Sequence, residues 1–372
     1  MRARLACIAG LSAVALLAAA CGSSGGGGGG TPSSSSGSSS SSAPAAAKFK
    51  ACLVSDTGTV NDKSFNQSAY QGATEAAAVN PNITAQFLPS ASPTDYAPNI
   101  TSFINQKCGI IVTVGFLMGD ATQKAAQANP DQKFAIVDFS YAKPLDNVDA
   151  LLFNTVEDGF QGGYLAAAMS KTHKVATFGG QKLPTVTIYM DGFWDGVQYY
   201  NQKHHANVQV LGWNEKTQNG SFTGNFTDLT AGQRLTTTFI SEGADIIFPV
   251  AGNVGLGAAK AVQTADNAAG TQKVNMMWVD TDGCISAAQY CKYFITSINK
   301  GITVAVKTAV LAAQKGDFKG GNYIGTLANN GVGLAPFHDF DSKIPASVKA
   351  ELDQIKADII SGKIKPATKS PA

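Results

Sequence analysis

The chain has 372 residues, with 28 Lys and Arg against 26 Asp and Glu, a formal net charge of +2 and 44% hydrophobic residues. This composition excludes a disordered chain, and the length predicts roughly two domains if about 150 residues make one. Charged residues are only 15% of the chain, and their near balance leaves no basic field to neutralise a phosphate backbone. Nucleic-acid polymers are therefore not expected as partners.

Residues 1–20 are predicted to be an export signal. Arg2 and Arg4 precede an apolar run at 5–17 that is too short to span a bilayer, and alanines stand directly before Cys21. A cysteine at this place resembles the lipidation site of a bacterial lipoprotein signal, which implies that Cys21 carries a lipid. Ala18 occupies the position where such signals usually have leucine. A plain secreted protein with a free Cys21 is the alternative.

Residues 21–47 are predicted to be the lipidated cysteine and a flexible tether. From 22 to 47 the chain is almost entirely Gly, Ser and Ala, a composition that buries too little apolar surface to offset the entropy of ordering. No later stretch is apolar for about 18 residues, so a transmembrane helix is not expected. The expectation is a globular body held by its lipid at the extracytoplasmic face of a cell membrane.

Four cysteines follow the tether, namely Cys52, Cys108, Cys284 and Cys291. An even number in an exported chain favours disulfides, and three pairings are possible. We favour Cys52 with Cys108, which both stand at the entrance of apolar strands, and Cys284 with Cys291, which share a polar loop. None of the histidines lies at ligand spacing from a cysteine, so no metal site is expected.

From residue 49 onward, short apolar runs alternate with amphipathic segments. Strands are predicted at 51–55, 83–88, 109–115, 134–138, 150–153, 174–178, 208–213, 245–250, 274–280 and 293–297. Helices are predicted at 64–79, 93–106, 120–129, 159–171, 186–203, 231–242 and 257–268. This alternation predicts an α/β fold with right-handed crossovers and largely parallel sheets.

These strands are too many for one small sheet and indicate two doubly wound lobes with a ligand cleft between them. The N-terminal lobe is expected at 48–155 and 283–340, the C-terminal lobe at 156–282, and a C-terminal helix and tail at 341–372. The chain is expected to cross back near Asp282, so that strand 293–297 rejoins the first lobe. Ligands bind such folds at the carboxyl ends of the strands, which makes strand-end residues the candidates for the site.

The first strand is followed by a polar loop that runs into a helix capped by Asp62 or Ser64. The free N–H groups of a helix start, flanked by the carboxamide of Asn61 and the Asp62 carboxylate, suit a polar ligand. Phe65 and Tyr70 stand on the first turns of this helix. Ordinary capping with two core aromatics is the alternative interpretation.

Several segments at these strand ends match one known pattern. They are N-D-K-S-F-N-Q-S-A-Y-Q-G at 61–72, V-G-F at 114–116, A-I-V-D at 135–138, G-A-D-I-I-F-P-V-A-G at 243–252, V-D-T-D at 279–282 and I-T-S-I-N-K at 295–300. From about residue 50 to 337 the chain resembles the basic membrane protein family, the substrate-binding lipoproteins of ABC transporters. The resemblance implies a type I periplasmic-binding-protein-like fold and an ABC permease as partner. Because characterised members include purine nucleoside receptors, it also implies a nucleoside-like small molecule as ligand.

The resemblance further implies which residues contact a base. They are Asn61 and Asp62 for polar contacts, Phe65 or Tyr70 for one stacked ring, and Phe226 for the second. Stacking contributes about 1–3 kcal/mol per base, so two rings would supply much of the affinity. Phe222 stands in a similar motif just before Phe226, and either ring is a candidate, with Phe226 preferred.

The resemblance also implies that Asp138 accepts a hydrogen bond from the ligand, that Asp280 accepts from the sugar hydroxyls, and that Lys300 donates to the sugar. A helix cap is the alternative for Asp138, and a solvated side chain is the alternative for Lys300. Gly252 stands at a strand-to-helix turn, where it would allow close approach of the backbone to the sugar. The two aspartates end apolar strands, where a carboxylate is costly to bury without a partner. A carboxylate can accept hydrogen bonds from neighbouring ribose hydroxyls, which fits these positions.

Two other functions remain open. The first is a ligand-binding sensor, and the second is an exported hydrolase that uses Asp138 and Asp280 as an acid–base pair. Outside the Gly/Ser-rich tether, the sequence has no G-x-S-x-G, no dinucleotide or P-loop fingerprint, and no Cys or His arranged with a base. We therefore expect a binding protein with no catalytic residue and no cofactor.

Overall fold

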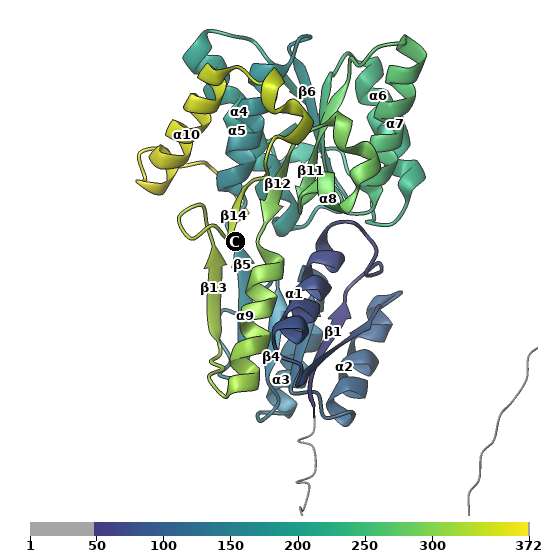
Figure 1. Ribbon diagram of the computed structural model, residues 1–372, viewed down its shortest axis with the longest axis vertical. Coiled ribbons are helices and arrows are strands. Elements are labelled where there is room, and N and C mark those ends of the chain that lie inside the picture. The colour runs from purple at the N-terminus through teal and green to yellow at the C-terminus, as the bar shows by residue number, and fades with distance from the viewer. Residues whose placement is uncertain (1–47, 371–372) are drawn as a thin grey trace, which may run out of the picture. The chain divides into compact units, whose positions relative to one another are not determined.

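The computed structural model describes residues 48–370, so the signal segment, Cys21 and the tether lie outside the described residues. The described chain forms two α/β lobes, each built on a six-stranded sheet, which Figure 1 shows one above the other. The expected α/β architecture with two mainly parallel lobes is confirmed.

The sheet of the N-terminal lobe is parallel throughout. In spatial order its strands are β13 (Gly321–Gly325), β5 (Val148–Phe153), β4 (Phe134–Val137), β3 (Ile110–Val114), β1 (Phe49–Ser55) and β2 (Ile83–Leu88). Every residue of β3, with the sequence I-I-V-T-V, is buried. Such a continuous apolar run is typical of a parallel strand that is covered on both faces.

Helices cover both faces of this sheet. One face carries α1 (Phe65–Val79) and α9 (Ile302–Lys315), and the other carries η1 (Pro93–Asp95), α2 (Tyr96–Asn105), η2 (Phe116–Met118) and α3 (Gly119–Ala128). Successive residues of β1 point to opposite faces, because side chains alternate along a strand. Leu53 belongs to the hydrophobic cluster that includes α1 and α9, whereas Val54 packs with Ile100 and Phe103 of α2.

The sheet of the C-terminal lobe is also mainly parallel. In spatial order its strands are β14 (Val332–Leu334), β12 (Phe294–Lys300), β11 (Asn275–Asp280), β10 (Ile246–Val250), β6 (Lys174–Gly179) and β7 (Gln209–Leu211). Only β14 is antiparallel to its neighbour among these strands. A small hairpin of β8 (Trp213–Asn214) and β9 (Asn219–Gly220) stands beside the sheet.

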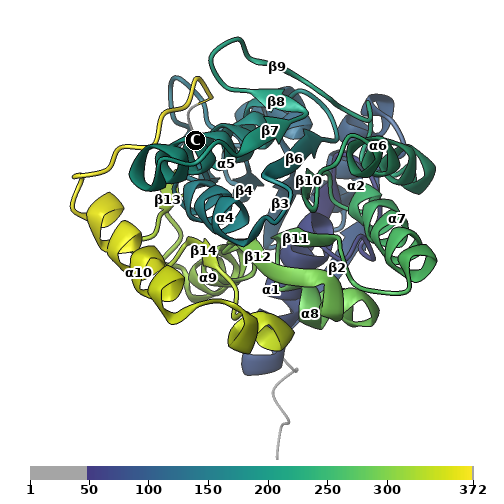
Figure 2. The same cartoon turned by 90° about the horizontal axis from the view of Figure 1, so that it is seen from above.

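Figure 2 shows this sheet between two groups of helices. On one side lie α4 (Val156–Met169) and α5 (Pro184–His204), with α10 (Ala346–Ile360) packed against α4; on the other lie α6 (Leu229–Ser241), α7 (Val254–Ala269), α8 (Gly283–Ser286) and η3 (Ala288–Tyr293). The helical turn η4 (His338–Lys343) precedes α10. Gly163 and Gly196 allow α4 and α5 to approach closely, because a Cβ at either would overlap backbone of the other helix.

The chain passes between the lobes after β5, after β12 and after β13. The expectation that strand 293–297 rejoins the first lobe is wrong, because this strand, observed as β12, pairs in parallel with β11 and places Ile298 opposite Val279. Its short connection from β11 favours pairing with the preceding strand in the same sheet. The strand that does rejoin the N-terminal lobe is β13, which the sequence pattern did not predict. Within 283–340, only α9 and β13 therefore belong to that lobe.

Both expected disulfides are present. Cys52 of β1 is bonded to Cys108, which stands two residues before β3, and Cys284 of α8 is bonded to Cys291 of η3. Within residues 48–370, no helix combines the length and apolar character needed to cross a membrane.

Candidate functional site

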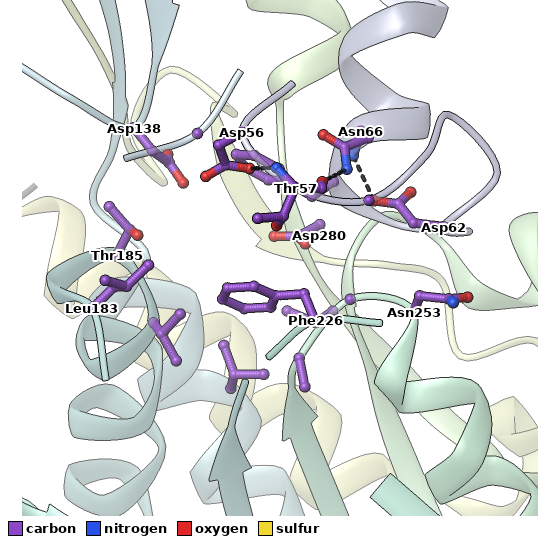
Figure 3. A pocket seen from close by; sticks show the side chains of 18 of the residues that line it. Asp56, Thr57, Asp62, Asn66, Asp138, Leu183, Thr185, Phe226, Asn253 and Asp280 are labelled. Atoms are coloured by element: carbon purple, nitrogen blue, oxygen red, sulfur yellow. Dashed lines mark hydrogen bonds between the residues drawn. The ribbon is translucent and has the colours of Figure 1, made fainter. Parts of the chain in front are cut away.

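A cavity of about 240 Å³ lies between the two lobes, at the carboxyl ends of their parallel strands. Its N-terminal wall comes from the segments that follow β1, β3 and β4, and its C-terminal wall comes from the ends of β10, β11 and β12 and the first turns of α5. Figure 3 shows these side chains converging on one space. This is the edge of a doubly wound sheet at which ligands bind.

The structure brings most of the predicted site residues to this cavity. Those that line it are Asp62, Phe65, Asp138, Phe226, Gly252, Asp280 and Lys300. Asn61 and Tyr70 are not among the lining residues. The predicted sugar-side set is thus assembled in one place, whereas the predicted base-side set is assembled in part.

Asn61 and Tyr70 point elsewhere for local reasons. Asn61 is exposed in the turn before α1, where its backbone N–H donates to Thr59 Oγ1 over 3.4 Å. Tyr70 packs edge to face on Phe87 of β2, with ring centroids 5.7 Å apart. Tyr70 follows Phe65 by more than one helical turn, so α1 presents the two rings in different directions.

Asp62 lines the cavity, but its carboxylate already serves the helix start. Oδ1 accepts the backbone N–H groups of Ser64 and Gln67, both over 3.0 Å, and Oδ2 accepts that of Asn66 over 2.8 Å. Burial raises the pKa of Asp62, although these three hydrogen bonds act to lower it. Of the two expected capping residues, Asp62 therefore caps α1, while the Ser64 hydroxyl is turned toward the other lobe.

Two aromatic rings reach the cavity from opposite lobes. Phe65 comes from the first turn of α1, and Phe226 comes from the loop before α6. Figure 3 shows the Phe226 ring inside the cavity. Gly180 makes room for this ring, since a Cβ there would overlap it. Phe222 instead packs edge to face on Trp213, with centroids 5.9 Å apart, so Phe226 is the ring that faces the cavity.

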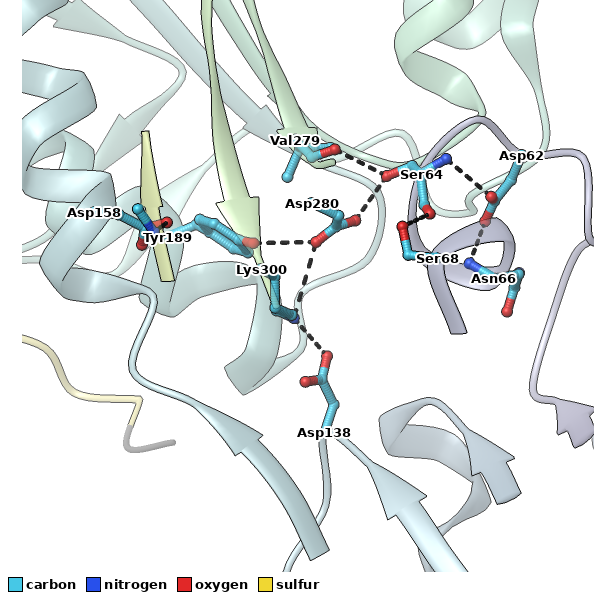
Figure 4. A network of polar contacts seen from close by, with 11 residues as sticks. Asp62, Ser64, Asn66, Ser68, Asp138, Asp158, Tyr189, Val279, Asp280 and Lys300 are labelled. Carbon is cyan, nitrogen blue, oxygen red and sulfur yellow. Dashed lines mark hydrogen bonds and ion pairs between the residues drawn. The ribbon is translucent and has the colours of Figure 1, made fainter. Parts of the chain in front are cut away.

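A network of buried polar groups crosses from one lobe to the other (Figure 4). Lys300 Nζ lies 2.8 Å from Asp138 Oδ2 of the N-terminal lobe and 3.9 Å from Asp280 Oδ1. Asp280 Oδ2 accepts from Ser64 Oγ over 2.7 Å, and Oδ1 accepts from Tyr189 Oη over 3.1 Å. The strand ends of both lobes are therefore joined through Asp138, Lys300 and Asp280.

The charged groups of this network are buried. Lys300 is 6% exposed, and its Nζ lies 5.2–5.7 Å from the ring centroids of Phe65, Phe153 and Tyr189. Burial raises the pKa of Asp138, and the Lys300 ammonium opposes that rise. Two carboxylates face one ammonium group here. The site therefore favours a ligand that offers neutral hydrogen-bond donors, such as hydroxyl groups, over an anion.

Asp138 and Asp280 also share an unusual backbone. Their φ angles are 70° and 67°, in the left-handed region that residues other than glycine seldom adopt. Gly252, at the end of β10, turns in the same region with φ of 52°. A Cβ at Gly252 would meet no neighbouring atom, so glycine suits this position for its backbone and not for space. Strained strand ends that point carboxylates into one cavity are typical of functional sites.

The sequence analysis missed several lining residues. Asp56 directly follows β1 and is 7% exposed; burial, together with the nearby charge of Asp138, raises its pKa to about 7. Asn66 donates from Nδ2 to the Thr57 carbonyl over 2.8 Å, while its Oδ1 is buried without a hydrogen-bond partner among the described residues. A buried acceptor beside a cavity can accept a hydrogen bond from a ligand or from a water molecule. Asp56 carries the same signal as Asp138, a carboxylate after an apolar strand.

Tyr189 and Thr185 were missed for another reason. They line the cavity from the first turns of α5, in an aromatic stretch whose pattern indicates core packing. Asp191 of the same helix is fully buried and accepts hydrogen bonds from Trp213 Nε1 over 3.0 Å and from Thr368 Oγ1 over 2.8 Å. The C-terminal tail therefore helps to hold α5, and with it Tyr189, in place.

We expect Asp56 to make the protein less stable as the pH rises from about 4 to about 7. In this window the unfolded chain has lost the Asp56 proton, while the folded chain, with a pKa of about 7, still holds it. Stability falls with rising pH wherever the folded state binds more protons. One pKa unit corresponds to about 1.4 kcal/mol, so the loss approaches about 4 kcal/mol.

Urea unfolding at several pH values, on wild type and Asp56→Asn, measures this effect. The variant should lose less stability than wild type across the window. Parallel pH profiles for the two proteins would show that Asp56 does not hold its proton in the folded state.

With this geometry established, three comparisons place the chain among known proteins. A family model described as "ABC transporter substrate-binding protein PnrA-like" matches residues 49–368. The ABC transporter nucleoside-binding protein BmpA of Lactococcus lactis is 30% identical over 329 residues, which cover 85% of this chain and 88% of that protein. Basic membrane protein A of Borreliella burgdorferi is 29% identical over 321 residues, covering 85% and 86%.

A crystal structure from the ABC transporter solute-binding proteins of Aeropyrum pernix K1 has the same fold. It superposes with a TM-score of 0.77 at 25% identity and covers 85% of this chain and 92% of that one. The match extends over both lobes described above.

Proposed function

Because the chain belongs to the PnrA-like family of ABC transporter substrate-binding proteins, we propose that it captures a nucleoside between its lobes and delivers it to a membrane permease. The observation that best supports a nucleoside as ligand is a pair of aromatic rings, Phe65 and Phe226. They line the same cavity as the network of Asp138, Lys300 and Asp280. Aromatic faces suit a base, and carboxylates beside a lysine suit a sugar with free hydroxyl groups. The name of the Lactococcus lactis relative supports the same ligand class.

In this proposal the base lies between Phe65 and Phe226, and the ribose hydroxyls donate to Asp138 and Asp280. Each carboxylate oxygen of Asp280 already accepts one hydroxyl from the protein. A carboxylate offers about four acceptor positions, so two remain for ligand hydroxyls. The Asn66 Oδ1 acceptor, which is buried and has no hydrogen-bond partner within residues 48–370, would accept from an N–H group of the base. A purine offers the larger stacking area and is the preferred base.

Lobe closure is part of the mechanism. The cavity walls come from both lobes, and two hydrogen bonds join one lobe to the other. Ser64 Oγ donates to Asp280 Oδ2 over 2.7 Å, and Trp278 Nε1 donates to the Lys63 carbonyl over 3.0 Å. A ligand that contacts both walls stabilises the closed arrangement over any open one. We infer that the closed form is the one presented to the permease.

We infer that the protein acts outside the cytoplasm and is anchored at the membrane by lipid on Cys21. The signal segment and the cysteine that follows it support this location, as do two disulfides in the folded body. Mass spectrometry of the N-terminal peptide from a membrane fraction tests it. Recovery of Cys21 as a free thiol in released protein would favour the plain secreted alternative.

Thermal-shift screening of nucleosides, free bases and simple sugars tests the ligand class. A ligand at a hundred times its dissociation constant stabilises by about 2.7 kcal/mol. Mass spectrometry of the ligand recovered after incubation separates binding from hydrolysis. We expect a nucleoside to raise Tm and to be recovered unaltered; its cleavage to base and sugar would instead establish the hydrolase alternative.

Replacing Phe226 with alanine should weaken nucleoside binding. Loss of one stacked ring costs about 1–3 kcal/mol, which corresponds to roughly a 5- to 150-fold rise in Kd. Phe222→Ala is the matched control, because that ring packs on Trp213 and does not line the cavity. Calorimetric titration compares the two variants. A larger effect from Phe222→Ala would show that Phe222, and not Phe226, stacks on the base.

A further inference from the structure

A second group of chemically reactive side chains lies outside the cavity. Asp282, Cys284 and His338 each offer one ligand atom, and these atoms all lie within 4.8 Å of one another. In a tetrahedral zinc site with bonds of about 2.0–2.3 Å, ligand atoms stand about 3.3–3.8 Å apart. A small inward shift would therefore suit a cation. The sequence pattern does not predict this group, because His338 is far from the other two residues along the chain.

The carboxylate and the imidazole are already oriented. Asp282 Oδ1 accepts the backbone N–H of Cys284 over 3.0 Å, which leaves Oδ2 turned toward His338 Nε2 at 2.7 Å. The hydrogen bond at Oδ1 restricts the Asp282 carboxylate and stays in place when Oδ2 binds a metal. The contact between Oδ2 and Nε2 joins two ligand atoms, and a cation would replace it. The His338 and Asp282 side chains are 32% and 13% exposed, so an ion can reach them from solvent.

The sulfur of Cys284 is bonded to Cys291, and a disulfide sulfur is not a thiolate ligand. A dithiol donor can change this. Two electrons and two protons pass to the disulfide, giving a Cys284 thiol and a Cys291 thiol, while the donor is oxidised to its own disulfide. Because the Cα atoms of the two cysteines are 4.5 Å apart, the freed Cys291 thiol stays beside Cys284. It is not in the group within 4.8 Å, so its side chain must rotate to join the other ligands.

We propose that reduction of the Cys284–Cys291 disulfide opens a four-ligand site for a zinc-like divalent cation, formed by Cys284, Cys291, Asp282 and His338. Binding releases the two thiol protons, and the cation is held by two thiolates, one carboxylate and the neutral imidazole. Two thiolates with an imidazole favour zinc over calcium or magnesium, which prefer oxygen ligands. The oxidised chain has only the carboxylate and the imidazole to offer and is not expected to bind.

The second disulfide provides an internal contrast. Cys52 and Cys108 are 0% and 4% exposed, so a dithiol in solution reaches them less readily than Cys284 and Cys291, which are both partly exposed. Mild reduction should therefore free two thiols and leave the buried pair intact. None of the four proposed ligands lines the nucleoside cavity, so this proposal and the proposed function can fail independently.

The test uses the full chain with Cys7→Ala and Cys21→Ala, so that the remaining cysteines are those of the two disulfides. The protein is reduced mildly under nitrogen, freed of the dithiol, and titrated with Co²⁺, whose thiolate complexes absorb in the near ultraviolet. Zn²⁺ is then added to displace the Co²⁺. Alkylation and mass spectrometry identify the cysteines that were reduced.

We expect one Co²⁺ per reduced chain, thiolate absorption that Zn²⁺ abolishes, and no such absorption in the oxidised chain. His338→Ala and Asp282→Asn should each raise the Kd at least tenfold, and Cys284→Ser should abolish the absorption. His205→Ala, at an exposed histidine elsewhere, is the control and should bind as the parent does.

Equal metal binding by the oxidised and reduced chains would overturn the proposal. So would unchanged affinity in both His338→Ala and Asp282→Asn, because the thiols alone would then hold the metal. Near-ultraviolet circular dichroism follows the fold of the reduced chain. A reduced chain that loses this signal and takes up no metal would likewise contradict a site formed by the folded protein.

Discussion

Replacing Lys300 with methionine is expected to destabilise the free protein by about 3–5 kcal/mol. Methionine keeps the length of the side chain among the three surrounding rings but leaves Asp138 and Asp280 buried together without a cation. Removing one partner of a buried ion pair costs this much because the remaining charge is uncompensated. Urea unfolding without ligand measures the loss.

The matched control is Lys307→Met. Lys307 forms an ion pair with Glu75 over 3.2 Å, but both side chains are about a third exposed. Such a surface pair contributes about 0–1 kcal/mol. If the two variants lose the same stability, the Lys300 network is not the buried ion pair described here.

The Lys300→Met variant should also depend on pH in a defined direction. Lys300 acts to lower the pKa of Asp138, so its loss lets burial raise that pKa further. A folded state that holds the proton more tightly than the unfolded state loses stability as the pH rises. The gap between variant and wild type should therefore widen from acid toward neutral pH.

Asp280→Asn should abolish or strongly weaken nucleoside binding. The change keeps the shape of the side chain but removes the charge that would accept ribose hydroxyls. Truncating a buried charged hydrogen bond at an interface costs about 2–5 kcal/mol, or roughly a thirtyfold to several-thousandfold rise in Kd. Calorimetric titration with the ligand found by screening gives the value.

This change should also lower the stability of the free protein, because Asp280 accepts hydrogen bonds from Ser64 and Tyr189 even without ligand. Ser64→Ala separates the two effects. It removes the hydrogen bond between the lobes and leaves the Asp280 carboxylate in place. Binding that is lost in Asp280→Asn but largely kept in Ser64→Ala would assign the carboxylate to the ligand; equal losses would assign it to lobe closure.

The sequence placed Asp138, Asp280 and Lys300 at one cavity because the signal is positional. Each stands at the end of a strand or directly after it, and parallel strands bring their carboxyl ends to one edge of the sheet. The same argument applied to Asp56, which went unnoticed beside the more polar loop that follows it. Tyr189 could not be identified in this way, since it reaches the cavity from a helix.

The residues expected to contact a base were harder to place, because the pattern does not reveal which way a side chain on α1 points. Phe65 and Tyr70 are both aromatic and close in sequence, yet one faces the cavity and the other packs on Phe87. Asp62 is placed correctly, but its role as a cap depends on hydrogen bonds that only the structure shows.

The prediction of the fold rested on the alternation of apolar and amphipathic segments. The prediction was wrong where that alternation is weak. β13 is a short edge strand with only its last residue buried, and β14 has three residues. Without them, strand count alone suggested that β12 returns to the N-terminal lobe. Sheet membership depends on pairing across the whole chain, which the local pattern does not contain.

The most direct test of the proposed site is a calorimetric titration of wild type and Asp280→Asn with a purine nucleoside and its 2′,3′-dideoxy analogue. If the base stacks between Phe65 and Phe226 while the ribose hydroxyls donate to Asp280, wild type should prefer the ribonucleoside by at least about tenfold, equal to about 1.4 kcal/mol. Asp280→Asn should lose most of that preference. Equal affinity of wild type for the two compounds, or the same preference in both proteins, would contradict the account.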